Sequence, residues 1–308
     1  MLDLDTFLTT LYVMVDDLLK HLPENASKPG PKPSLCRSEI VTLALFSQWK
    51  QFSRETGFVS YAKRHLRGAF PGLPSRTQFN RAVRSHHDAI VAVGQALVRQ
   101  LGSQNQLDEV LDGMGVKVRN HRRRGRGWLA GIAQIGFSNR LGWYEGVHLL
   151  TAVDPKGVLT GFAVAPASVN EQPFAEDFLA ARAAPVARLA MVGQNATGVY
   201  LADTGVEGRE RHQQWSNDDG ATMLVPPRND RKHAWPRPWR RDHARLRQVV
   251  ESVHSTWTGQ FRLDDERPHT LSGVLARFAA IAALYNACIS INRSLGRADL
   301  AFANLVGW

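Results

Sequence analysis

Apolar positions in the first hundred residues recur every three or four positions, which is the spacing of amphipathic helices. This spacing predicts a helix over 2–21, and the segment PENASKPGPKPS (23–34) then marks a linker because Pro and Gly interrupt helices. A second helix is predicted from Arg37. A third is predicted over 75–101, where Ser75 and Gln78 have the spacing of a capping box. We therefore expect an all-helical N-terminal domain over residues 1–105.

After Gly102 the pattern changes to short apolar runs separated by turn residues. The stretch 143–168 predicts two strands joined by the turn DPKG, which is a hairpin signal. Further strands are predicted at 107–118, 197–203 and 221–227, and helices at 173–184, 208–215, 241–257 and 271–292. This order indicates an α/β domain over 106–295 with a mixed sheet and flanking helices, followed by a C-terminal tail, 296–308.

Composition narrows the class of protein. Hydrophobic residues make up 44% of the 308 residues, which argues against overall disorder. Cys36 and Cys288 lie far apart in no metal-ligand spacing, so neither a disulfide framework nor a zinc site is expected. The apolar run 278–291 is too short to span a bilayer and reads as a buried helix, and the N-terminus does not resemble a signal peptide. We expect a cytoplasmic protein without a membrane partner.

Charge suggests the kind of partner. The formal net charge is +10, and a surplus of that size points to a polyanion, most often nucleic acid. A merely basic surface is the alternative.

Three acidic residues stand out against this basic background. Asp112 and Asp203 each end a predicted strand, and Glu251 borders the apolar stripe of the predicted helix 241–257. Each has an ordinary explanation: Asp112 as a turn former, Asp203 as a helix cap, and Glu251 as an ion-pair partner of Arg247. Together they suit another purpose, because two divalent ions held by carboxylates can activate the attacking oxygen and stabilise the leaving oxygen in phosphoryl transfer.

The spacing and contexts of these acids resemble those of the DDE transposases of bacterial insertion sequences. The segments LCRSEIVTLALFSQW, FPGLPSRTQFNRAVR, LADTGVEG and RQVVESVHSTW are most similar to insertion-sequence family nine-eighty-two. The resemblance implies a ribonuclease-H-like catalytic domain in which Asp112, Asp203 and Glu251 are the catalytic, metal-binding acids. It also implies two Mg²⁺ ions, replaceable by Mn²⁺. Many relatives have serine after the first aspartate, where this chain has Gly113.

Basic residues concentrate in two stretches, 117–128 and 226–247, on either side of the predicted acids. They would grip DNA phosphates or form solvated loops. Trp235 and Trp239 would stack on unpaired bases or pin a proline-rich loop. The helix at 75–100 would recognise DNA or serve as scaffold. The candidate DNA-binding residues are Arg76, Arg81, Arg84, Lys117, Arg119, Arg122, Arg123, Arg124, Arg231, Lys232, Trp235, Arg237, Trp239, Arg240, Arg241 and Arg247.

The resemblance implies a transposase that binds the terminal repeats of its element, cleaves double-stranded DNA at the ends and joins the 3′-hydroxyls to target DNA. We expect it to act as a homo-oligomer on DNA, associated with the bacterial nucleoid. Two alternatives stay open at this point: a catalytically inactive DNA-binding relative, and a ribonuclease-H-like nuclease that cuts without joining.

Overall fold

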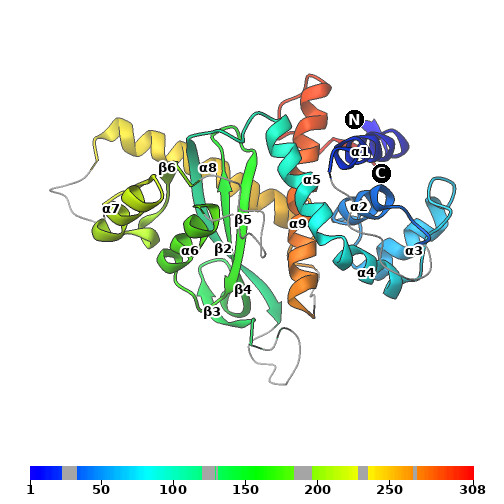
Figure 1. Cartoon of the computed structure of the whole chain (residues 1–308), viewed down its shortest axis with the longest axis horizontal. Helices are drawn as coiled ribbons and strands as arrows, with labels where there is room; N and C mark the ends of the chain where they lie inside the picture. The colour runs from blue at the N-terminus through cyan, green and yellow to red at the C-terminus, as the bar shows by residue number, and fades with distance from the viewer. Residues whose placement is uncertain (23–32, 120–128, 130, 184–195, 228–234, 266–268) are drawn as a thin grey trace. The chain divides into compact units, whose positions relative to one another are not determined.

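Backbone contacts divide the chain into a helical unit and a sheet unit in the computed structural model (Figure 1). The helical unit comprises Met1–Leu97, Trp257–Glu266 and Thr270–Trp308, and the sheet unit comprises Val98–Thr256 with Arg267–His269. The structure describes residues 1–22, 33–119, 129, 131–183, 196–227, 235–265 and 269–308.

The helical unit contains the expected N-terminal helices and the last helix of the chain. Its elements are β1 (Leu2–Asp3), α1 (Leu4–Lys20), α2 (Arg37–Phe46), α3 (Glu55–His65), α4 (Arg76–Ser85), most of α5 (His87–Gln100), α9 (Leu271–Ser294) and β8 (Val306–Gly307). Helix α9 is apolar and long enough to cross a membrane by composition, but nearly all of it is buried. It packs against α2 and α4, whereas the expected division grouped it with the sheet. That three-part division stays a prediction.

One feature of the helical unit differs from expectation, and a second adds detail that the sequence analysis did not give. The single helix expected at 75–101 is broken into α4 and α5, because the side chains of Ser85 and His86 both hydrogen-bond the Ala82 carbonyl (2.9 and 2.8 Å) and end α4. The expected tail is ordered. Leu2 pairs in parallel with Val306, and the Trp308 ring stacks at 5.9 Å on that of Phe46.

The sheet unit is built on a mixed sheet. Its strands are β2 (Asp108–Arg119), β3 (Gln134–Ser138), β4 (Gly142–Val153), β5 (Leu159–Pro166), β6 (Gly198–Leu201) and β7 (Ala221–Leu224). The strand order is β3-β4-β2-β6-β7, and β5 continues the edge beside β4 after β3 ends. Strand β4 is antiparallel to its neighbours β2, β3 and β5, whereas β6 and β7 run parallel to β2. This confirms the predicted ribonuclease-H-like mixed sheet.

The hairpin predicted from DPKG joins β4 to β5. The Asp154 carboxylate accepts hydrogen bonds from the backbone N–H groups of Lys156 and Val158, at 2.8 and 2.9 Å. Gly157 has φ +92°, a conformation that side-chain-bearing residues rarely adopt. The turn is therefore specified locally by its aspartate and its glycine.

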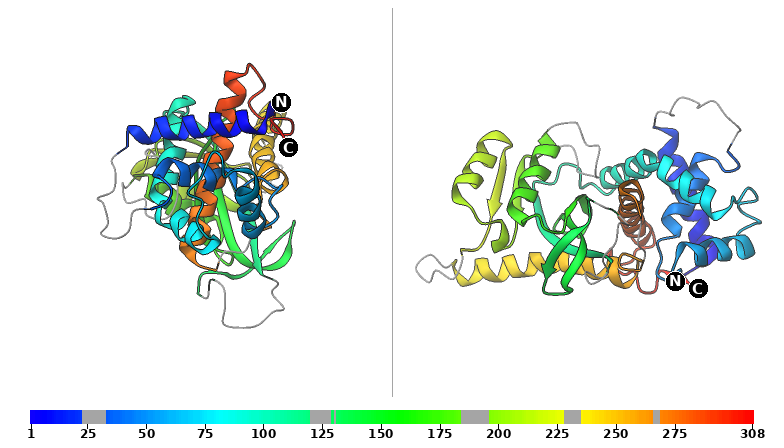
Figure 2. Two further views of the ribbon diagram at one scale, coloured as in Figure 1. Left: turned by 90° about the vertical axis from the view of Figure 1, so that its right-hand side faces the viewer. Right: turned by 90° about the horizontal axis from the view of Figure 1, so that it is seen from below.

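Helices cover both faces of this sheet (Figure 2). Helix α6 (Glu171–Ala183) and α7 (Arg209–Asp218) lie on one face, and α8 (Arg237–Gly259) crosses the other. A short 3-10 helix, η1 (Thr204–Val206), follows β6. Because side chains alternate along a strand, neighbouring residues of β2 point to different helices: Glu109 contacts α6 and Asp112 contacts α8.

A buried ion pair fixes α6 on the sheet. Arg182, in the last turn of α6, donates to Glu109 of β2, to the Tyr200 hydroxyl of β6 at 3.0 Å and to the Thr160 hydroxyl of β5 at 3.3 Å. The side chains of Arg182 and Glu109 are only 3% and 7% exposed. The guanidinium also lies 4.6 Å from the centre of the Phe178 ring. One side chain thus joins the helix to three strands.

Replacing Arg182 by Met should lower the free energy of unfolding by about 3–5 kcal/mol, because Glu109 would be left buried without its partner. Urea unfolding followed by circular dichroism measures this. The matched control is Arg211→Met, which breaks the half-exposed pair with Glu176 and should cost at most about 1 kcal/mol. Equal losses in the two variants would contradict a structural role for the buried pair.

Candidate active site

Asp112 and Asp203 are brought side by side by the pairing of β2 with β6. The parallel register joins Val110 to Leu201, so the two aspartates follow at equivalent positions two residues later. Asp112 does not end its strand, contrary to expectation. Strand β2 continues to Arg119, because the antiparallel partner β4 extends beyond the end of β6. Asp112 instead lies where the pairing with β6 stops, which opens a notch in the sheet.

Asp203 caps a short helix, which is one of the two alternatives that the sequence left open. Its Oδ1 accepts the backbone N–H of Gly205 at 2.7 Å and so caps η1. Its Oδ2 lies 4.0 Å from the guanidinium of Arg247. The capping bond fixes the carboxylate in orientation, and its second oxygen faces Asp112 and α8.

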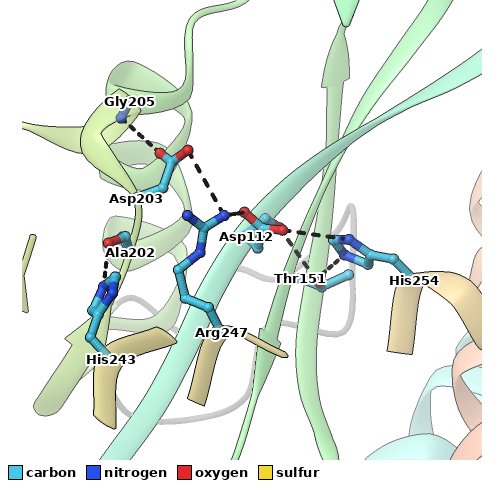
Figure 3. Close-up of polar contacts among 8 residues, drawn as sticks. All are labelled: Asp112, Thr151, Ala202, Asp203, Gly205, His243, Arg247 and His254. Carbon is cyan, nitrogen blue, oxygen red and sulfur yellow. Dashed lines mark hydrogen bonds and ion pairs between the residues drawn. The ribbon is translucent and has the colours of Figure 1, made fainter. Parts of the chain in front are cut away.

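Helix α8 presents three polar side chains to this notch (Figure 3). His243 hydrogen-bonds the carbonyl of Ala202 at 3.1 Å, and Arg247 donates to Oδ1 of Asp112 at 3.2 Å. Two turns later, His254 hydrogen-bonds the hydroxyl of Thr151 at 2.8 Å. Because these residues are four and seven positions apart, they share one face of the helix.

The surroundings of Asp112 disfavour a negative charge. Burial raises the pKa of Asp112 to about 6 against the opposing effect of Arg247, and the charges of Asp203 and Glu251 raise it further. The adjacent His254 offers no compensating charge, because burial and the charges of Arg140 and Arg247 lower its pKa to about 4. The Asp112 carboxylate therefore depends on a cation at this position.

A fourth acid, Glu171, lies in the same notch and was not singled out by the sequence analysis. It is the first residue of α6, and burial, the charge of Asp203, a hydrogen bond to Asp203 and the charge of Asp112 raise its pKa to about 7. The sequence carries only a weak signal for it, an acid at the start of a predicted helix after a strand. Its proximity to Asp203 depends on how the loop after β5 folds back.

Two glycines leave space for these side chains. A Cβ at Gly205 would overlap Oε2 of Glu171 and lie 2.9 Å from Oδ1 of Asp203. A Cβ at Gly113 would overlap Nε2 of His148 and lie 3.4 Å from Oε1 of Glu171. The ring of His148 is held there by a hydrogen bond from Nδ1 to the Val169 carbonyl, at 3.2 Å. The departure from serine at position 113 therefore has a steric reason.

Glu251 lies on α8 one turn beyond Arg247, and its side chain is exposed. Arg247 pairs with Asp112 rather than with Glu251, the partner that the sequence analysis left as an alternative. Glu251 is close enough for its charge to raise the pKa of Asp112. The buried stripe beside it, Val250, Val253 and Trp257, matches the predicted apolar stripe.

The candidate DNA-binding residues are found in several settings. Arg76 pairs with Glu55 at 3.6 Å, and Arg84 donates to the Asn80 carbonyl. Lys117 and Arg119 lie on β2. Exposed positions are taken by Arg81 on α4 and by Arg237, Trp239, Arg240 and Arg241 in the first turns of α8. Arg122, Arg123, Arg124, Arg231 and Lys232 lie outside the described residues.

Comparison with known proteins identifies this arrangement. Residues 110–287 match the model of the family described as "Transposase DDE domain". The matched range runs from β2 to α9 and includes all four acids of the notch and Arg247.

The chain belongs to the transposase DDE domain family.

Solved structures of Mos1 transposase are also similar, at low identity. A pre-cleavage Mos1 transpososome matches with 10% identity and a TM-score of 0.23, covering 86% of this chain and 80% of the other. The Mos1 strand transfer complex matches with 12% identity and a TM-score of 0.24, covering 85% and 81%. No curated protein matches this chain.

Transposases of the DDE type generally use divalent metal ions, and the donors in this transposase domain suit them. Carboxylate oxygens are the ligands that Mg²⁺ and Mn²⁺ prefer. Arg247 already places positive charge against Asp112 and Asp203, at 3.2 and 4.0 Å. Within the described residues, no three His, Cys, Asp or Glu side chains are already spaced around one ion. The carboxylates of the notch therefore fit a divalent ion by the chemistry of their oxygen donors.

We predict that Gly113→Ser will destabilise the sheet unit by about 1–3 kcal/mol, because the new side chain would displace His148. The double variant Gly113→Ser with His148→Ala should recover most of this loss. Thermal unfolding of both proteins measures the effect, with Gly57→Ser on α3 as the control because a Cβ there meets nothing within 4 Å. If His148→Ala gave no recovery, His148 would not be the reason for glycine at position 113.

Proposed function

We propose that this protein is the DNA transposase of a bacterial insertion sequence related to family nine-eighty-two. It would bind the terminal repeats of its element, cleave at the ends and join the 3′-hydroxyls to target DNA. One observation carries the proposal. Asp112 and Asp203 lie side by side at the end of the β2–β6 ladder, and Arg247 contacts both, in a chain of the transposase DDE domain family.

We further propose Asp112, Asp203 and Glu251 as the catalytic, metal-binding acids. When bound, two Mg²⁺ or Mn²⁺ ions would supply charge stabilisation for the attacking and leaving oxygens of the phosphoryl transfer. Asp112 and Asp203 would contribute oxygens from a rigid sheet, where the capping bond to Gly205 holds Asp203 in place. Glu251 lies on the exposed side of α8, so it would approach from the DNA side of the notch.

Arg247 has a second possible partner besides the aspartates. Its Nε atom is buried and has no hydrogen-bond acceptor among the residues that the structure describes. A DNA phosphate oxygen would satisfy this donor. In the complex with DNA, this side chain would hold the DNA backbone beside the reacting bond.

The partners and location follow from the same proposal. We propose double-stranded DNA as substrate and target, a homo-oligomer assembled on it, and a cytoplasmic location in association with the nucleoid. The exposed arginines of α4 and of the first turns of α8 would contact phosphates and contribute salt-dependent affinity. The strongly basic segments at 120–128 and 228–234 would add to that affinity by their charge.

Asp112→Asn, Asp203→Asn and Glu251→Gln should each reduce Mg²⁺-dependent cleavage and joining below detection while DNA binding survives. The reason is that each removes a metal-binding charge without removing a phosphate contact. Purified protein, incubated with the DNA that flanks its own gene, measures cut and joined products together.

The control for these variants is Asp218→Asn, an exposed acid at the end of α7, which should keep full activity. Near-normal activity in any one of the three variants would remove that residue from the set. Cutting without joining by the unaltered protein would indicate a nuclease, and binding without cutting would indicate an inactive relative.

Trp235 and Trp239 differ in setting, which separates the stacking and packing hypotheses. Trp239 is 62% exposed, whereas Trp235 is partly buried with its ring 5.3 Å from that of His243. Both line a mainly apolar pocket with Val199, Leu201 and Leu224. His243 joins the pocket to the Ala202 carbonyl, next to Asp203. An unpaired base could enter this pocket within reach of the acids.

We therefore predict that Trp239→Ala slows cleavage of fully paired ends about 5- to 150-fold, equivalent to about 1–3 kcal/mol of lost stacking. Ends whose terminal bases are already unpaired should be cut at the normal rate, and the melting temperature should not change. Trp235→Ala should instead lower the melting temperature and slow both substrates. An equal effect of Trp239→Ala on both substrates would end the stacking hypothesis.

A further inference from the structure

We propose that Glu171 is a metal-binding carboxylate of this transposase, which would hold a divalent ion together with Asp203. The proposal rests on the proposed function and adds a residue to the set of Asp112, Asp203 and Glu251. Three observations support it: the fixed position of the beginning of α6, the space that Gly205 leaves for the Glu171 carboxylate, and the excess of negative charge in the notch.

The first argument is the fixed position of Glu171. Helix α6 is anchored at its far end by Arg182 and along its length by the buried rings of Phe174 and Phe178. The loop before it is held by backbone hydrogen bonds from Ala167 to Gly146 and from Val169 to Pro166. This packing fixes the beginning of α6 beside the notch, so its first side chain, that of Glu171, lies there.

The second argument is the space. Gly205 has no positive φ and needs no special backbone, yet a Cβ there would overlap Oε2 of Glu171. Gly113 likewise has an ordinary φ, and a Cβ there would lie 3.4 Å from Oε1 of the same carboxylate. A Cβ at Gly205 would thus displace the Glu171 carboxylate, whereas at Gly113 the overlapping atom is Nε2 of His148 and Glu171 is only in ordinary contact. The two glycines follow the two aspartates closely in sequence, so the space opens toward the proposed metal ligands.

The third argument is charge. Asp112, Asp203 and Glu171 meet in the notch, and Arg247 is the cation that contacts the two aspartates, at 3.2 and 4.0 Å. These three acids bring more negative charge together than one guanidinium neutralises. A divalent cation held by Asp203 and Glu171 would relieve the repulsion that Arg247 alone leaves.

Glu171 also faces the notch from a different direction than Glu251. Glu171 comes from α6, on the opposite face of the sheet from α8, which carries Glu251. The two glutamates therefore need not compete for the same ion. Glu171 would hold a divalent ion from the side of α6, and Glu251 would act from the side of α8.

The experiment is a Mn²⁺ titration of the full-length protein without DNA, followed by electron paramagnetic resonance. Glu171→Gln should weaken Mn²⁺ binding on the order of 10- to 100-fold. Gly205→Ala should do the same, because it keeps every acid but displaces the Glu171 carboxylate. The matched control is Glu176→Gln on the same helix, whose partner is Arg211 on the surface, and it should bind Mn²⁺ normally.

A thermal melt of each variant, with and without Mn²⁺, separates metal binding from folding. Mn²⁺ should raise the melting temperature of the unaltered protein and of Glu176→Gln, and the rise should be lost in Glu171→Gln. Normal Mn²⁺ binding by Glu171→Gln, with loss in Asp203→Asn, would overturn the role of Glu171 and leave the proposed function intact. No Mn²⁺ binding by the unaltered protein would overturn both.

Discussion

Repulsion among carboxylates in one small notch is the constraint on which the rest of the site depends. Asp112, Asp203 and Glu171 meet there, and burial raises the pKa of Asp112 and of Glu171. Arg247 offsets part of this cost through the two aspartates. Further positive charge would offset the remaining repulsion among the carboxylates, and a divalent cation would supply it.

The sheet unit supplies the rigidity that such a cluster needs. Asp112 lies inside a twelve-residue strand that is paired with β4 through most of its length. Asp203 follows the parallel strand β6 and is oriented by its capping bond to Gly205. The buried pair of Arg182 and Glu109 locks α6 to the other face, so the acids approach from elements that do not move independently.

Glu251, the third acid that we propose for the site, is placed less firmly than Asp112 and Asp203. Helix α8 brings Arg247, not Glu251, into contact with the aspartates, and leaves Glu251 exposed. The proposed function gives Arg247 a further partner, because its buried Nε has no acceptor among the described residues and a DNA phosphate oxygen would supply one.

The sequence by itself determined the elements whose signals are local. Periodicity predicted the sheet strands other than β3, the DPKG turn predicted the hairpin of β4 and β5, and strand-following acids predicted Asp112 and Asp203. Tertiary structure alone decided what depends on pairing and packing across distant segments: that β2 continues past Asp112, that α9 joins the helical unit, and that Glu171 reaches Asp203. The physical reason is that strand pairing, helix packing and the space beside a glycine depend on contacts between residues far apart in the chain. Such contacts produce no local pattern in the sequence.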